Sequence, residues 1–236
     1  MQIVPHRQSR AGSPQFSCTG CRGCNSRIGG KNNERINGSS RSRYRFYRGV
    51  YGQLNVACSP VSVEELRQIE MTVGWSEEDV RILQRHGNIF KKRAEQMLDS
   101  WRAVIGAQPH LAKWFLGPNG KPDEEYKAKV KKRFVQWVLD ACFGHHDQAW
   151  LDYQEEIGLP HTPEKKNQTD GAHTPAVAPL RYLIAFGTVV GISTRRFFVD
   201  AGVRGDELRK LEDAWSKAVQ LHIALWSRPY AKDGLW

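Results

Sequence analysis

Apolar side chains recur every three or four residues along most of the chain from about residue 60, and alternating apolar and polar runs are almost absent. Ser62 with Glu65, and Ser76 with Asp79, form capping boxes that predict the first turns of two helices. In the second helix the apolar stripe runs from Val80 to Trp101, about six turns, and we expect Pro109 to end it. This pattern predicts an all-α domain.

The later segments repeat the pattern between Pro and Gly punctuation. A short helix is expected around 110–116, then the turn GPNGKP, then a helix capped by Asp123 whose stripe includes Tyr126, Phe134 and Trp137. Asp147 starts a further helix, which we expect Gly158 to close in a left-handed cap. Two long helices follow at about 178–200 and 206–227. Roughly seven or eight helices result, with a polar break after residue 158.

Charge separates the first part of the chain from the rest. Residues 1–50 hold ten Lys or Arg and one acid, Glu34, a net charge of +9 out of +10 for the whole chain. The segment is rich in Gly, Ser and Asn and lacks periodicity, so we expect a disordered basic tail at 1–48. An organellar transit peptide and a start codon placed too early are the alternatives, and in both the mature protein lacks the tail. With no long apolar run, a cytoplasmic body without membrane contact is expected.

Five cysteines and eight histidines were considered as metal ligands. Cys18, Cys21 and Cys24 lie together in CTGCRGC, but a fourth ligand is missing, so we favour a chance cluster over an iron–sulfur or zinc loop. A single heme iron needs only one neutral imidazole beside an apolar pocket. His161 suits that role because Pro160 restricts its backbone at the end of a helix. His222, on the stripe of the last helix, is the alternative, although a satisfied core histidine is the simpler interpretation.

Several stretches resemble the protoglobins, single-domain relatives of the heme domains of globin-coupled sensors. They are DSWRAVIGAQPHLAKWF (99–115), YKAKVKKRFVQWVLD (126–140), DQAWLDYQEEIGLPH (147–161), KKNQTDG (165–171), PLRYLIAF (179–186) and AWSKAVQLHIALWSRPYAK (214–232). GVYG at 49–52 is similar to an ordered N-terminal segment of the family. The resemblance implies a globin-like helical sandwich with an extra short N-terminal helix over 49–236. It also implies a homodimer formed by the last two long helices.

The same resemblance implies site residues. The histidine that ends the DYQ..EIGL.H motif is the proximal heme ligand of the family, and His161 occupies that position. By the same resemblance, Arg133 occupies a position from which its side chain could pair with a heme propionate. The matched pocket positions are apolar, and ordinary core packing is the alternative for each: Trp101, Val130, Phe134, Leu183, Phe186 and Val190.

One departure concerns the distal side of the heme. Protoglobins commonly carry Tyr directly after the pocket Trp, where its hydroxyl reaches the ligand, and this chain has Arg102 there. Two orientations are open: the guanidinium of Arg102 reaches solvent or a propionate, or it contacts the ligand itself.

These features predict a heme b protein that binds a diatomic gas (oxygen, carbon monoxide or nitric oxide) reversibly, for sensing, scavenging or storage. The alternative is a heme enzyme that detoxifies nitric oxide, peroxynitrite or peroxide. No distal acid–base pair is evident, so we do not expect an enzyme beyond a heme-dependent side activity. Nucleic acid is expected as a partner only through the basic tail.

Overall fold

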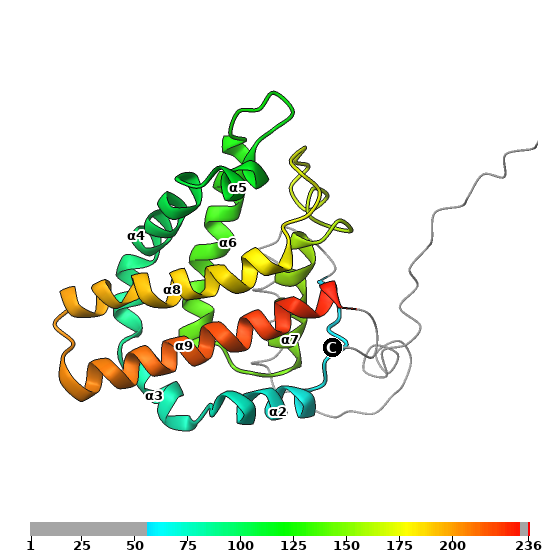
Figure 1. Ribbon diagram of the computed structural model, residues 1–236. Coiled ribbons are helices and arrows are strands. Elements are labelled where there is room, and N and C mark those ends of the chain that lie inside the picture. The colour runs from blue at the N-terminus through cyan, green and yellow to red at the C-terminus, as the bar shows by residue number, and fades with distance from the viewer. Residues whose placement is uncertain (1–55, 232–235) are drawn as a thin grey trace, which may run out of the picture. The chain divides into compact units, whose positions relative to one another are not determined.

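The computed structural model describes residues 56–231 and 236, and these form an all-α domain (Figure 1). The tail, its three cysteines and the GVYG segment lie outside the described residues. Eight α-helices are present among the described residues: α2 (Val63–Val73), α3 (Glu77–Arg85), α4 (Gly87–Gly106), α5 (Pro109–Ala112), α6 (Glu124–Phe143), α7 (Gln148–Gly158), α8 (Leu180–Asp200) and α9 (Gly205–Ser227). Three 3-10 turns join them: η2 (Lys113–Phe115), η3 (Leu159–His161) and η4 (Arg228–Tyr230). No β-strand occurs in this part of the chain, which confirms the predicted fold class.

The predicted helix starts are confirmed by their side-chain caps. Ser62 and Ser76 each accept the N–H three residues on, and Glu65 and Asp79 complete the two boxes. The side chain of Asp123 accepts the N–H of Tyr126 at 2.9 Å to open α6. Asp147 caps α7 in the same way, through the N–H of Trp150 at 2.9 Å.

Two predicted helix boundaries were wrong, and glycine explains both. The long stripe is divided between α3 and α4 at His86, just before Gly87. A Cβ on Gly87 would lie 1.9 Å from the Phe143 ring, so the glycine serves a close approach of α4 to α6. Gly158 is right-handed (φ −66°, ψ −47°), so it does not close α7 in a left-handed cap, and the chain continues into η3. Its missing side chain makes room for Pro229, 3.1 Å from where a Cβ would be.

The core lies where α4 packs against α6 and α8, and where α9 packs against α8, α3, α7 and α2. Figure 1 shows α8 and α9 side by side along the domain. The contact is close at Gly187, where a Cβ would lie 2.2 Å from Cδ1 of Ile223. Aromatic rings fill the centre, with Trp101, Trp150 and Trp215 fully buried.

Helix α8 differs from the other core helices in its exposed face. By length and composition alone it is the one helix, within the described ranges, that could cross a membrane, and only 22% of its most apolar window is buried. Ile184 and Ile192 are 51% and 71% exposed. The opposite face packs on α4 and α9, so α8 is a core helix that also exposes apolar side chains.

Candidate functional site

A largely apolar cavity opens between α6, α8 and the end of α7. About 1080 Å³ in and in front of it is free of protein atoms, a volume that includes open solvent. The segments from α4 to α9 all contribute to its wall: Ile105, Leu111, Trp114, Phe115, Tyr126, Val130, Arg133, Phe134, Trp137, Ile157, Pro160, His161, Lys166, Ala178, Tyr182, Leu183, Phe186 and Trp226.

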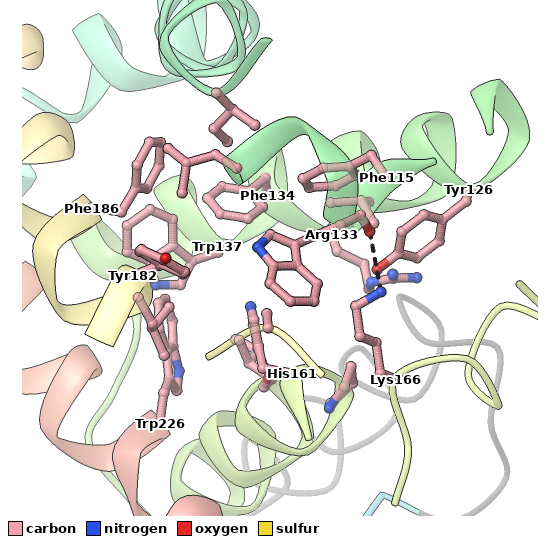
Figure 2. A pocket seen from close by; sticks show the side chains of 18 residues that line it. Phe115, Tyr126, Arg133, Phe134, Trp137, His161, Lys166, Tyr182, Phe186 and Trp226 are labelled. Atoms are coloured by element: carbon pink, nitrogen blue, oxygen red, sulfur yellow. Dashed lines mark hydrogen bonds between the residues drawn. The ribbon is translucent and has the colours of Figure 1, made fainter. Parts of the chain in front are cut away.

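His161 enters this cavity from the end of α7 (Figure 2). Its Nδ1 lies 2.9 Å from the carbonyl oxygen of Ile157. A carbonyl can only accept, so Nδ1 carries the hydrogen and donates it. The other ring nitrogen, Nε2, hydrogen-bonds to no described residue. The bond to Ile157 therefore fixes the tautomer that leaves the Nε2 lone pair free on the cavity side.

Electrostatics keep this imidazole neutral. Burial lowers the pKa of His161, and hydrogen bonding to the backbone of Ile157 and Gly158 partly opposes that shift. The positive charges of Lys166 and Arg133 lower the pKa further. A neutral imidazole with one free lone pair is the form that binds a metal ion.

The backbone of His161 is fixed as firmly as its ring. Its carbonyl oxygen accepts the N–H of Ala178 at 2.9 Å and the hydroxyl of Tyr230 at 3.2 Å. The single hydrogen of the Tyr230 hydroxyl is shared with the carbonyl of Ala178, which is the closer acceptor at 2.6 Å. The chain that follows α9 thus fastens the two ends of the loop between α7 and α8.

Six of the nine predicted site residues line the cavity together: Val130, Arg133, Phe134, His161, Leu183 and Phe186. Trp101 and Val190 are not among the residues that line it. The indole of Trp101 is fully buried and donates to Ser193 on α8 at 2.8 Å. Its ring lies behind the wall, 6.3 Å from that of Phe134. Val190 belongs to the core one turn beyond Phe186, because only the first half of α8 borders the cavity.

Two arginines have definite partners. Arg133 makes a two-pronged ion pair with Asp170, with N–O distances of 2.7 and 2.5 Å. Arg102 is not on the cavity wall, and its guanidinium donates to the backbone carbonyl of Lys127 on α6 at 2.9 Å. The structure therefore directs Arg102 to a neighbouring helix, an arrangement that neither proposed orientation included.

His222 is enclosed elsewhere. Its ring packs between Trp137, Trp150 and Trp226, and its Nδ1 lies 2.6 Å from the carbonyl of Ala218. Burial lowers its pKa to about 3. It does not line the cavity, and no cluster of three or more metal-ligating side chains occurs anywhere in the described part of the chain.

Sequence reasoning missed Lys166 and most of the aromatic wall, since Phe134 and Phe186 are the only Phe, Tyr or Trp residues of the described wall that it assigned to the site. The helical period had placed Tyr126 and Trp137 on the same stripe as Phe134, but it did not assign them to the wall of a cavity. Lys166 gave no signal, because a lysine in a polar loop is normally exposed, whereas this one is only 3% exposed.

The residues present fit a heme. The ring needs a flat apolar slot, its iron needs a neutral imidazole, and its two carboxylates need polar groups at one edge. In Figure 2 His161 projects into the middle of the cavity, with Phe186, Tyr182 and Trp226 towards one end and Arg133, Tyr126 and Lys166 towards the other. The orphaned Nε2 of His161 is the group that an iron atom would satisfy.

Comparison with known proteins agrees with this geometry. The globin domain of the Geobacter sulfurreducens globin-coupled sensor is 16% identical and covers 70% of this chain and 97% of its own, with a TM-score of 0.56. At that identity the likeness shows the fold, which is that of a globin. A comparison with the curated proteins gives no match. The model of the family described as Protoglobin matches residues 62–236, well over half of the sequence. The chain therefore belongs to the protoglobin family of heme globins.

Proposed function

We propose that the protein binds a diatomic gas reversibly at the iron of a heme b whose only protein ligand is His161. One observation carries the proposal: the hydrogen-bonded, neutral imidazole of His161 presents a free Nε2 to an apolar cavity. When bound, the heme would supply an iron that can take up a diatomic gas. Val130, Phe134, Leu183 and Phe186 would exclude water from the ring, and Ile157 would hold the imidazole proton at Nδ1.

The composition of the wall favours binding over catalysis. Besides His161, the titratable side chains on the described wall are Arg133, Lys166, Tyr126 and Tyr182, and none is a second histidine or a carboxylate. Cleavage of peroxide needs a positioned acid–base group beside the reacting atoms. The described wall offers neither a histidine besides His161 nor a carboxylate for this role, so turnover of peroxide or peroxynitrite is the less supported function.

Absorption spectra of the ferric, ferrous and carbon monoxide forms test the assignment. We expect His161→Ala to lose stable heme, because the iron loses its protein ligand, and added imidazole to restore part of the ferrous spectrum. His222→Leu is the matched control, a second buried histidine with the same type of Nδ1 bond, and it should keep the wild-type spectrum. An unchanged ferrous spectrum in His161→Ala would show that the ligand lies elsewhere.

A homodimer through α8 and α9 is part of the same proposal. The exposed residues of α8 include Ile184, Ala185, Thr188 and Ile192, which share one face at helical spacing. Such an apolar face on a helix that otherwise packs in the core is typical of a surface covered by a partner. A second copy, with the two faces related by a twofold axis, would cover it in a self-complementary way.

A further inference from the structure

The polar end of the cavity holds more positive than negative charge. We call Arg133, Lys166, Tyr126 and Asp170 the charged corner. The Asp170 side chain is 4% exposed and is fully engaged by the two prongs of Arg133. Lys166 donates to the carbonyl of Trp114 at 3.2 Å and to the hydroxyl of Thr174, both neutral acceptors. Within the described chain, no carboxylate forms an ion pair with Lys166.

Burial makes this imbalance unfavourable. Lys166 is 3% exposed, and desolvation lowers its pKa to about 8, with the charge of Asp170 opposing the shift only in part. A buried ammonium without a paired carboxylate destabilises the fold unless an anion approaches it. Its position on the wall of the cavity means that the anion can come from a bound molecule.

The hydroxyl of Tyr126 is a second unused donor in the charged corner. The residue is 8% exposed, and burial raises its pKa to about 12, so the hydroxyl stays neutral and keeps its proton. No hydrogen bond joins this hydroxyl to any residue that the structure describes. The ammonium of Lys166 lies 5.1 Å from the centre of the Tyr126 ring, so the Lys166 ammonium and the Tyr126 side chain lie in the same part of the cavity.

We propose that the charged corner binds one carboxylate of the porphyrin, with Lys166 as its ion-pair partner and Tyr126 as a hydrogen-bond donor. The inference rests on the proposed heme site and assigns to Lys166 the role that the family resemblance implied for Arg133. Arg133 already has a carboxylate, whereas Lys166 does not, so the porphyrin acid completes the pairing. An acid group at the edge of an apolar ring matches a charged end beside an aromatic wall (Figure 2).

The test compares heme with its dimethyl ester in the full-length holoprotein. The readout is the first-order rate of ferric heme transfer to an excess of a heme-accepting apoglobin. Loss of a charge-assisted hydrogen bond should speed transfer by roughly 10- to 100-fold. We therefore expect Lys166→Met to release heme that much faster and to leave the rate for the dimethyl ester unchanged. Lys132→Met removes an exposed charge from the same end of α6 and should change neither rate.

Two variants guard against a folding defect. Lys166→Arg keeps the charge and should stay close to the wild-type rate, and Tyr126→Phe should release heme a few-fold faster while leaving the ester unaffected. If Lys166→Met does not accumulate as holoprotein, the release rates of heme and its dimethyl ester are compared in Lys166→Arg and Tyr126→Phe instead. Equal acceleration of heme and ester, or no acceleration of either, would overturn the proposal. Failure of the heme site itself gives a different result, since the wild type would then hold no heme through His161.

Discussion

At the scale of single residues, the site depends on hydrogen bonds that fix His161 from several sides. The ring is held by Ile157, and the carbonyl oxygen is held by Ala178 and Tyr230. Tyr230 lies in η4, 69 positions away in sequence, so a residue outside the cavity controls where the imidazole stands. Loss of such an outer contact typically lowers metal affinity by roughly 10- to 100-fold.

Tyr230→Phe should weaken both heme retention and the fold. The variant loses the bonds to His161 and Ala178, and about 1–2 kcal/mol of unfolding free energy is expected to go with them. Heme transfer to an acceptor should become several-fold faster, with the ferrous absorption maximum shifted. Tyr182→Phe is the control, because its hydroxyl bonds to no described residue. Wild-type transfer rates in Tyr230→Phe would mean that the imidazole is positioned without it.

Asp140 provides a pH-dependent term in stability. It is 8% exposed, and burial raises its pKa to about 6, with bonds from Tyr153 and Gln136 opposing the shift. Between pH 4 and 6 the folded state binds more protons than the unfolded state, so stability falls as pH rises through this window. The loss at pH 7 amounts to about 2–3 kcal/mol.

Asp140→Asn should therefore be more stable than the wild type above pH 6 and equal to it near pH 4. Denaturant unfolding at several pH values measures the difference directly. Asp213→Asn changes an exposed position on α9 and is the control. Its unfolding free energy should depend on pH in the same way as that of the wild type. If the unfolding free energy of Asp140→Asn fell with rising pH as steeply as that of the wild type, the pH dependence would belong to another group.

The residues that carry charge were the hardest to place from sequence. The apolar members of the wall follow helical spacing, so Val130 and Phe134 could be predicted to share a face. Spacing cannot say where a long flexible side chain ends. Arg102 reaches a carbonyl on α6, and Lys166 turns inwards from a polar loop, because each finds acceptors that only the folded chain brings close.

At the scale of helices, caps were predictable and close contacts were not. Capping is local, so Ser62, Ser76, Asp123 and Asp147 mark their helices in sequence. The roles of Gly87 and Gly158 depend on a ring and a proline from distant segments, which no local pattern contains. Helix α8 shows the same limit, since its period indicates an apolar helix but not which face stays exposed.

Ile192→Arg should convert the proposed dimer to a monomer. A charge at a position that is 71% exposed in the single chain is tolerated by the fold, whereas its burial between two copies of α8 is unfavourable. Sedimentation velocity of the holoprotein gives the mass. Met71→Arg, at an equally exposed position on α2, should leave the mass unchanged. A monomeric wild type, or a dimeric Ile192→Arg, would contradict the proposed interface.

At the scale of the whole molecule, the segment just before α2 belongs to the folded domain. The N–H groups of Ala57 and Ser59 donate to Glu156 and Asp152 on α7, at 3.1 and 2.9 Å. Glu156 is fully buried, and its other partner is Lys165. This segment therefore stabilises the helix that leads into His161, a role that its sequence did not indicate.

Two truncations separate this segment from the basic tail. Deleting residues 1–48 removes a net charge of +9 and should lower the isoelectric point from about 9.5 towards neutrality, with heme content unchanged. Deleting residues 1–61 also removes the partners of Glu156 and Asp152 and the buried Val61, and should reduce the unfolding free energy by about 2–4 kcal/mol. Loss of soluble holoprotein in the shorter truncation would show that the tail itself is structural.

The hydroxyl of Tyr230 on the carbonyl of His161 also has a consequence for biosynthesis. The imidazole is translated 69 residues before the side chain that anchors its backbone. At about 5–20 residues per second, roughly 3–14 s separate the two on the ribosome. During that interval the nascent chain has its iron ligand without the anchor, and Trp226, part of the wall, is also missing. Stable cofactor capture should therefore wait until the chain has been synthesised through Trp226 and Tyr230.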